Sequence, residues 1–452
     1  MKERKRILEE CLKILTSKGH YASILSTMET SFSVDKDSTS LDAEDGRDEG
    51  IRLRIFSGKG FLEHGETGCN RRSLLKKARE LVRQAGKPGR LSSPEKPIHK
   101  NFVSCGKDPR EVSVETKMDF CNALYGRFKH KEFVNLRVRY SESVRSSIFI
   151  DPQKSLSQHI VRVNVVVMPF VQSKGGEMRY HYKAFFAPGY EATDISDAAL
   201  RKVRKMAQKV ATAKKIRPGR YICYLSPEVT GLLAHESFGH GMEADTMLAG
   251  RARASEYLGK QIAPAEVSII DNPAYRTAHG TYFFDDEGTI TGPTYLVKKG
   301  IVMSPITDRY SAMRLQAERT GNARAESYDH KIYARMSNTY FDKGSKSPRS
   351  MLKDIKDGMY LHNSSGGMED PKGWGVQIQG IVAERIIDGK RTGELFYEVG
   401  MTGFLPDLLG NIKAVGKDLS VPGTGFCGKG HKEWVKVAEG GPSLVIQGVH
   451  LS

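Results

Sequence analysis

Hydrophobic and polar residues alternate with a period of two along several segments of the chain, and this period predicts β-strands. In the segment IRLRIF, for example, Ile51, Leu53 and Ile55 fall on one face. Strand-like segments recur at FVNLRVRY (133–140), SSIFI (146–150) and HIVRVNVVVMPFV (159–171). A short apolar run, YICYLS at 221–226, predicts a buried strand. Strands therefore make up much of the expected structure.

Other segments repeat apolar residues every three or four positions, which predicts amphipathic helices. One helix is expected at the start of the chain, and its apolar positions are Ile7, Leu8, Cys11, Leu12 and Leu15. Others are expected from Asn70 or Ser73 and from Asp194 or Ser196, where side chains can cap them. A further helix begins at Ser226-Pro227-Glu228, which combines a capping serine, a proline in the first turn and an acid at the positive end of the dipole. We expect it to run through VTGLLAHESFGHGMEAD.

The order of these elements predicts an α+β fold, with N-terminal α/β subdomains followed by a strand-rich C-terminal domain that carries the helix around residue 235. A chain of 452 residues is too long for one ordinary core. We place an N-terminal α+β domain at 1–105, a central strand-and-helix domain at 106–218 and the C-terminal domain at 219–452. Glycine, proline and serine predict a linker at 86–97, and the acidic segment 35–50 predicts a solvated loop.

Composition narrows the class of protein. The chain is 39% hydrophobic and 27% charged, and none of its apolar runs reaches the length of a membrane span. The cysteines form neither a CxxC pair nor a disulfide framework, so we expect free thiols in the cytoplasm. The formal net charge is +17, but the basic residues alternate with acids or apolar residues. This pattern favours a solvated basic surface over a nucleic-acid partner.

The segment HESFGH at 235–240 carries the strongest chemical signal. It resembles the zinc-binding helix motif H-E-x-x-H, but with one additional residue between the histidines. On an ideal helix, His235 and His240 would lie about 140° apart. A π-bulge can absorb one inserted residue, and Gly239 tolerates such a distortion. The spacing therefore predicts a locally widened helix at 236–240, in which both imidazoles ligate zinc and Glu236 serves as a general base.

Two histidines do not hold a catalytic zinc alone, so a third protein ligand is expected. Candidates within the helix are Glu243 and Asp245. The candidates elsewhere in the chain are His279, Glu326, His330 and Cys427. Spacing alone does not choose among them.

Almost the whole chain resembles the TldD/PmbA family of zinc metallopeptidases, specifically its metal-bearing TldD-type members. GLLAHESFGHGMEAD looks like that family's HEAxGHxxExD helix, with Ser237 where alanine is usual. The other matching blocks are FFDDEGT (283–289), GNARAESYDH (321–330), ARMSNTYF (334–341) and GKDLSVPGTGFCGKGH (416–431).

The resemblance implies that His235, His240 and Cys427 ligate zinc and that Glu236 is the catalytic base. It also implies a cytoplasmic peptidase that acts on unfolded peptides, without a membrane partner. Such proteins assemble as homodimers or as heterodimers with a related family member. In the C-terminal block, Gly423, Gly428 and Lys429 imitate a phosphate-binding loop, but Gly430 replaces the required serine or threonine, so we exclude a nucleotide site.

Four further residues in or near the matching blocks are weaker candidates for binding the substrate: His279, Tyr282, Tyr328 and His330. A role in packing or hydrogen bonding between strands explains the presence of each residue at least as well as substrate binding does. Two other functions stay open. One is a basic scaffold or modulator that binds nucleic acid or a protein partner without catalysis. The other is a metal amidohydrolase that acts on non-peptide amides.

Overall fold

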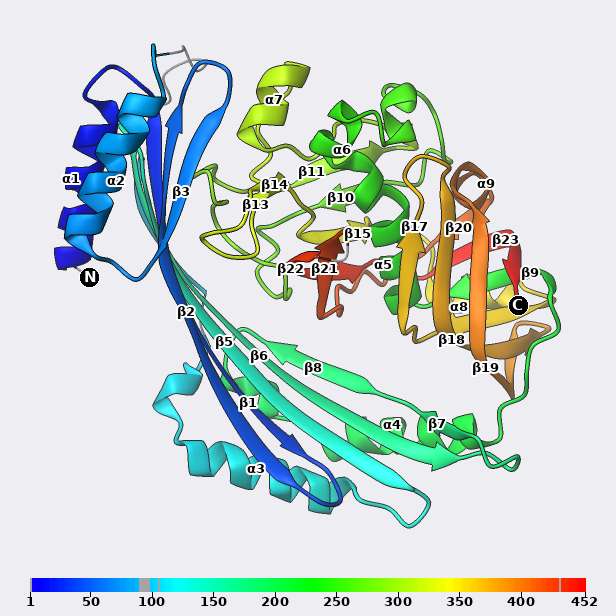
Figure 1. Cartoon of the computed structure of the whole chain (residues 1–452). Helices are drawn as coiled ribbons and strands as arrows, with labels where there is room; N and C mark the ends of the chain where they lie inside the picture. The colour runs from blue at the N-terminus through cyan, green and yellow to red at the C-terminus, as the bar shows by residue number, and fades with distance from the viewer. Residues whose placement is uncertain (1, 89–97, 105, 431) are drawn as a thin grey trace.

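An elongated and mostly antiparallel sheet forms one side of the molecule and faces a strand-rich C-terminal half (Figure 1). The computed structural model describes residues 2–88, 98–104, 106–430 and 432–452. Most of the predicted linker, residues 89–97, lies outside this part of the chain. The arrangement confirms the predicted α+β class. No helix among the described residues is long and apolar enough to cross a membrane.

The N-terminal sheet has eight strands, and its main path is β3-β2-β1-β5-β6-β4, with β7 and β8 also paired to β6. The strands are β1 (Ala22–Lys36), β2 (Leu41–Phe56), β3 (Phe61–Thr67), β4 (Ile98–Ser104), β5 (Asn135–Ile150), β6 (Lys154–Gln172), β7 (Met178–Tyr180) and β8 (Lys183–Ala187). Strands from both predicted N-terminal domains thus belong to one sheet. The division at residue 105 is not a boundary between sheets and stays a prediction.

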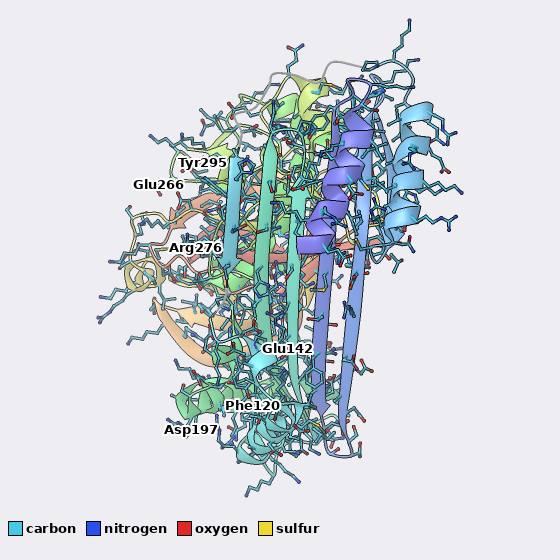
Figure 2. All side chains as sticks on the ribbon, turned by 90° about the vertical axis from the view of Figure 1, so that its left-hand side faces the viewer. Phe120, Glu142, Asp197, Glu266, Arg276 and Tyr295 are labelled. Atoms are coloured by element: carbon cyan, nitrogen blue, oxygen red, sulfur yellow. The ribbon has the colours of Figure 1, made fainter. Side chains whose placement is uncertain are left out.

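Two helix pairs cover different ends of this sheet (Figures 1 and 2). They are α1 (Lys2–Thr16) with α2 (Arg71–Gln84), and α3 (Val114–Phe128) with α4 (Asp197–Ala211). Each pair has its own apolar cluster against the strands. In the second, Lys117 Nζ of α3 donates to Glu142 Oε1 of β5 over 2.9 Å, and both side chains are buried. Figure 2 shows Glu142 on the sheet above Phe120.

The alternation in IRLRIF explains how the sheet joins its two neighbours. Ile51, Leu53 and Ile55 pack under α1 and α2, as predicted. The intervening Arg52 and Arg54 face the C-terminal half and are also buried. Arg52 Nε donates to the carbonyl of Tyr328 over 2.8 Å, and Arg54 pairs with Glu287. One face of this part of β2 is therefore apolar, and the arginines of the other face bind the C-terminal half.

The prediction of a solvated loop at 35–50 is wrong. Residues 41–50 form the first part of β2 and pair in continuous register with β1, from Lys36↔Leu41 to Thr27↔Gly50. Most of these acidic side chains are exposed. Strand formation here depends on backbone pairing with an amphipathic neighbour, so acidic composition does not prevent it.

The C-terminal half contains two larger sheets. The first, in the order β12-β11-β10-β15-β22-β21, consists of β10 (Ile269–Asp271), β11 (Thr294–Lys298), β12 (Ile301–Val302), β15 (Asn338–Phe341), β21 (Gly425–Lys429) and β22 (Lys432–Gly440). The second has the path β16-β9-β23-β19-β18-β17, with β20 paired to β23. Its strands are β9 (Gly219–Leu225), β16 (Asp357–His362), β17 (Gly366–Glu369), β18 (Gly375–Ile387), β19 (Lys390–Phe404), β20 (Ile412–Val415) and β23 (Leu444–Leu451).

Short elements connect these sheets. They are α5 (Pro227–Ala234), α6 (Ala244–Leu248), α7 (Arg309–Leu315), α8 (Pro348–Lys353), α9 (Leu405–Gly410) and the pair β13 (Ala323–Arg324) and β14 (Tyr333–Ala334). Helix α5 lies between the two sheets, and one apolar cluster joins it to both (Figure 1). At Gly231 a Cβ would collide with the backbone at Gly440 of β22. The helix that carries HESFGH is thus held close to the hairpin that carries Cys427.

Candidate metal centre

The helix that leads to the site begins where the sequence predicts. Strand β9 ends at Leu225, Ser226 takes the N-cap position and Pro227 opens the first turn of α5. The Ser226 hydroxyl makes no capping hydrogen bond, so proline and Glu228 remain as the local start signals. The α-helical part ends at Ala234, immediately before the first histidine.

Residues His235–Gly239 form a π-helical turn, followed by a 3₁₀ turn at His240–Met242. The predicted widening is confirmed, one residue earlier than expected. It brings the His235 and His240 rings to a centroid distance of 5.3 Å, at 89° to each other. Gly239 lies in the right-handed helical region, with φ −71° and a ψ of −69° that is more negative than in an α-helix, so its backbone needs no positive φ. Its lack of a side chain matters because a Cβ there would collide with the buried Met336 sulfur.

Cys427 completes a group of three possible metal ligands. It lies on β21, and its Sγ is 3.3 Å from His240 Nε2. One ligand atom from each of His235, His240 and Cys427 lies within 4.8 Å of the others. His235 and Cys427 are 6% and 3% exposed. Of the candidates for a third ligand that spacing left open, this structure brings Cys427 to the two histidines.

The electrostatics of this group suit a metal. Burial raises the pKa of the Cys427 thiol, but His240 and His235 lower it well below its ordinary value. Burial lowers the pKa of His235, yet Cys427 raises it to about 9. Within the described residues, the buried His235 Nδ1 has no hydrogen-bond partner. Two imidazoles and a thiolate are donors that zinc accepts in tetrahedral sites, with one position left for water or substrate.

Glu236 and Glu369 are carboxylates that line the same cavity as the three ligands. Glu236 is 7% exposed, and a Cβ at Gly367 would come within 2.7 Å of its Cγ. Glu369 lies two residues further along β17, and its carboxylate oxygens are buried without a hydrogen-bond partner in the described structure. Burial raises the pKa of Glu369 well above its ordinary value, although His240 opposes this effect. Sequence reasoning missed Glu369, because nothing in GGMED marks it.

The cavity has a volume of about 1100 Å³ and lies between the two halves of the molecule. The β2–β3 hairpin contributes Arg54 and Phe61 to its wall. The β21–β22 hairpin contributes Phe426 and Trp434, which are 61% and 47% exposed. A cavity of this size and mixed lining can hold a segment of several residues.

His279 and Tyr282, two of the weaker candidates, are buried outside the lining of this cavity. The Nδ1 of His279 bonds the Val437 carbonyl over 3.1 Å, and burial lowers its pKa to about 3. The hydroxyl of Tyr282 donates to the Gly321 carbonyl over 2.9 Å. Both residues have packing roles that explain them, and a role in substrate binding stays a prediction.

Tyr328 and His330 also lie outside the lining of the metal cavity. The Tyr328 hydroxyl lies 2.6 Å from Thr67 Oγ1, so its loop docks on the N-terminal sheet. His330 Nδ1 lies 3.1 Å from Glu433 Oε2. Substrate binding by these residues likewise stays a prediction.

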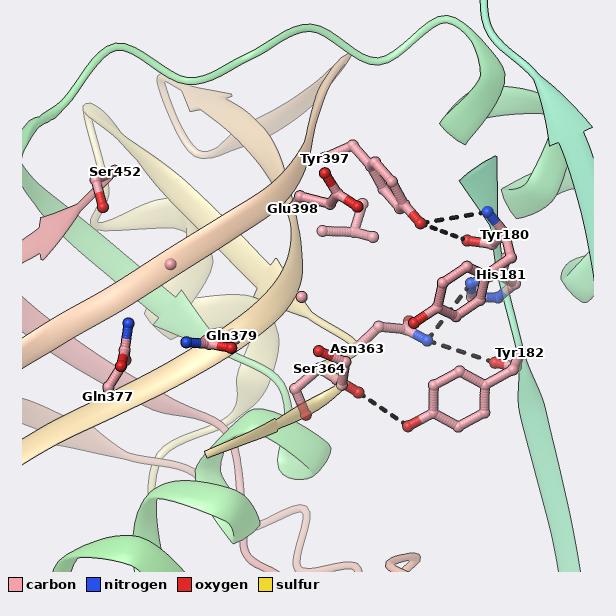
Figure 3. Close-up of a pocket in the computed structure, with 14 residues that line it drawn as sticks. Tyr180, His181, Tyr182, Asn363, Ser364, Gln377, Gln379, Tyr397, Glu398 and Ser452 are labelled. Carbon is pink, nitrogen blue, oxygen red and sulfur yellow. Dashed lines mark hydrogen bonds between the residues drawn. The ribbon is translucent and has the colours of Figure 1, made fainter. Parts of the chain in front are cut away.

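A second cavity, of about 400 Å³, lies between the N-terminal sheet and the β18–β19 pair (Figure 3). Tyrosine hydroxyls tie its walls together: Tyr182 donates to the Ser364 carbonyl over 2.9 Å, and Tyr397 donates to the Tyr180 carbonyl over 3.2 Å. Its buried His181 has a pKa lowered to about 3 by burial. The ligands and catalytic base expected from the sequence line the other cavity.

A family model supplies the identification. The model for the PmbA/TldA metallopeptidase C-terminal domain matches residues 218–452. The chain belongs to the TldD/PmbA family. This family assignment indicates a metalloprotease and implies a metal.

Relatives described as metalloproteases can be aligned with most of the chain. A metalloprotease of Methanothermobacter thermautotrophicus is 29% identical over 446 residues, which cover 97% of each protein. A zinc metalloprotease TldD homolog of Saccharolobus solfataricus is 29% identical over 326 residues, or 72% of this chain and 69% of that protein.

Two solved structures share the fold. A Thermotoga maritima protein described as a proposed modulator of a DNA gyrase has a TM-score of 0.81 at 17% identity, and the match covers 99% of this chain and all of that one. TldE from Thermococcus kodakarensis has a TM-score of 0.75 at 13% identity, with the same coverage. At these identities the likeness concerns the fold alone.

Proposed function

We propose that this TldD/PmbA family member is a zinc-dependent peptidase that hydrolyses peptide bonds in unfolded or extended polypeptides. In this proposal His235, His240 and Cys427 ligate the zinc and Glu236 is the general base. The observation that carries the proposal is the convergence of these three donors beside a buried glutamate in one large cavity. The donors come from a distorted helix and a distant hairpin, so adjacency in sequence does not account for their meeting.

Zinc in this position would supply a Lewis acid that polarises the scissile carbonyl. Glu236 would take a proton from the attacking water on a carboxylate oxygen and return it to the leaving amine. Among the described residues, Glu236 has neither a hydrogen bond nor an ion pair with a cationic side chain, so its carboxylate is available for this transfer. The packing of Gly367 against its Cγ limits where that carboxylate can lie.

The lining of the cavity supports a polypeptide substrate. Exposed apolar side chains of Phe426, Trp434 and Met368 lie on its wall and can contact residues of an extended chain. A folded protein would not enter a cavity of about 1100 Å³. Unfolded or extended polypeptides are therefore the expected substrates.

The decisive experiment assays the purified protein against an unfolded polypeptide and against small non-peptide amides, with and without a chelator. We expect cleavage of the polypeptide, loss of activity with the chelator and recovery on addition of zinc. Glu236→Gln should keep the metal and reduce turnover by about 10²–10⁴-fold, the range for loss of a general base.

Glu228→Gln is the matched control, because Glu228 lies earlier on the same helix and pairs with Lys183. It should retain activity. Polypeptide cleavage that persists in Glu236→Gln would overturn the assignment of the base. Cleavage of non-peptide amides alone would favour an amidohydrolase. Salt-sensitive nucleic-acid binding without hydrolysis, unaffected by the chelator, would favour the basic scaffold.

Assembly and location are further parts of the proposal. We expect a homodimer or a heterodimer with a related family member, located in the cytoplasm. Native mass spectrometry of the protein alone and with such a relative would measure the assembly. A monomer under both conditions would contradict it.

A further inference from the structure

Cys427 must be brought to the two histidines from a hairpin that is distant in the chain, and a buried ionic network spans the gap between them. Three charged side chains form it: Glu243 after the π-turn, Arg335 before β15 and Lys429 on β21. Their side chains are 2%, 1% and 21% exposed. Burying a charged side chain costs free energy unless the charge is paired. The burial of these three side chains therefore indicates a structural role for their ion pairs.

Lys429 links the strand of Cys427 to the segment that follows the histidines. It lies two residues after Cys427 on β21. Its Nζ donates to Glu243 Oε2 over 2.9 Å and to Asp245 Oδ1 over 2.9 Å. These are the two acids that the sequence left open as ligands, and the structure places them against this lysine.

Arg335 holds the backbone on which Cys427 lies. Its Nη2 donates to the Cys427 carbonyl over 2.7 Å, and its Nη1 donates to the Glu433 carbonyl on the adjoining strand. Its Nε lies 3.3 Å from Glu243 Oε1. One guanidinium therefore joins both strands of the hairpin to the carboxylate.

Glu243 is the centre of the network. One carboxylate oxygen faces Arg335, and the other accepts from Lys429 and lies 3.7 Å from His240 Nδ1. The opposite ring nitrogen of His240, Nε2, faces the Cys427 sulfur. Carboxylates behind ligating histidines commonly orient the ring through a hydrogen bond. Here the 3.7 Å contact is an ion-pair distance, so Glu243 acts on the ring electrostatically.

We propose that Glu243 is a positioning residue that fixes Cys427 relative to His240, acting through Arg335 and Lys429. It orients the histidine from one side and anchors the cysteine hairpin from the other. This inference rests on the proposed function, since it takes His240 and Cys427 as ligands. Its consequence is that the three-donor geometry is held by residues that do not themselves ligate.

Two lysines of the same hairpin provide a matched pair of variants. Lys429 pairs with Glu243, whereas Lys436 pairs with Glu29 of the N-terminal sheet. Their side chains are 21% and 23% exposed. Lys429→Met removes the ion pairs with Glu243 and Asp245, and Lys436→Met removes the ion pair of a similarly exposed lysine with Glu29. Only the first variant disturbs the proposed network.

The experiment measures zinc affinity by competition with a chromophoric chelator, and the spectrum of the cobalt-substituted protein, for wild type, Lys429→Met, Glu243→Gln and Lys436→Met. Thermal unfolding verifies that each variant is folded. We expect Lys429→Met and Glu243→Gln to bind zinc about 10–100-fold more weakly. Their thiolate-to-cobalt absorption should weaken, while Lys436→Met keeps the wild-type affinity and spectrum.

Wild-type affinity and spectrum in both Lys429→Met and Glu243→Gln would overturn the proposal. Equal weakening in Lys436→Met would also overturn it, because the effect would then be general to the hairpin. If Glu243→Gln does not fold, Lys429→Met decides the question. A Cys427→Ser variant separates this failure from that of the proposed function: unchanged affinity and spectrum there would remove Cys427 as a ligand altogether.

Discussion

Two groups of side chains in the described part of the chain have the donors and spacing of a metal site. The first consists of His235, His240 and Cys427, and the second of Glu326, His330 and Glu433. In each group the ligand atoms lie within 4.8 Å of one another. Distance alone does not separate them.

Burial and hydrogen bonding do separate them. The side chain of His330 is 39% exposed, and its Nδ1 already has Glu433 at 3.1 Å, an arrangement that needs no metal. Cys427 is 3% exposed, and the buried Nδ1 of His235 is unsatisfied among the described residues. Leaving a buried polar atom unpaired costs about 1–3 kcal/mol. Donors that are already satisfied at the surface indicate an ion pair, whereas buried and unsatisfied donors indicate a ligand site.

The two groups should first differ in thiol reactivity. In the metal-free protein at pH 7, we expect iodoacetamide to modify Cys427 on the order of 10-fold faster than the other described cysteines. Burial raises the pKa of Cys11 and of Cys121 to about 12, whereas the two histidines lower that of Cys427. The lowered pKa of Cys427 favours its thiolate relative to the thiols whose pKa is raised, so its modification should be the fastest of the described cysteines. Peptide mass spectrometry measures the rates, and zinc should protect Cys427.

Cys69 is the internal control for access, because it is partly exposed and burial raises its pKa. Faster modification of Cys69 than of Cys427 would mean that accessibility outweighs ionisation. The absence of protection by zinc would remove the contrast between the two donor groups.

A second effect, on stability, should follow from changing the π-turn, on which only the first group depends. Gly239→Ala places a methyl group against the Met336 sulfur in the core. Overpacking of this kind destabilises folded proteins by about 1–3 kcal/mol. Urea unfolding measures the loss, with Gly126→Ala as the control because a Cβ at that helical position meets open space. Equal stability of the two variants would contradict the packing role of Gly239.

Local patterns in the sequence predicted what local physics determines. The five-residue spacing of the histidines predicted a widened helix, and the π-turn forms there. The alternation in IRLRIF predicted its apolar face. The need for glycine at position 239 could not be predicted from the sequence. It arises from close packing against Met336, which is distant in the chain.

Pairing between distant segments was beyond the sequence alone. The acidic segment 41–50 is a strand because it pairs with β1. The composition of the segment does not indicate that pairing. Spacing did not select Cys427 over His330, and only the resemblance to a family did so. The network around Glu243 likewise depends on Arg335 and Lys429, which three-dimensional packing brings together.

The most direct test of the central claim is the zinc content of purified wild type, Cys427→Ala and His330→Ala, measured by mass spectrometry of the metal. The account predicts about one zinc per chain in wild type, since catalytic sites hold one ion with three protein ligands. His330→Ala should keep this zinc, and Cys427→Ala should lose it. Full zinc content in Cys427→Ala, or loss in His330→Ala alone, would contradict the assignment of the buried group as the metal centre.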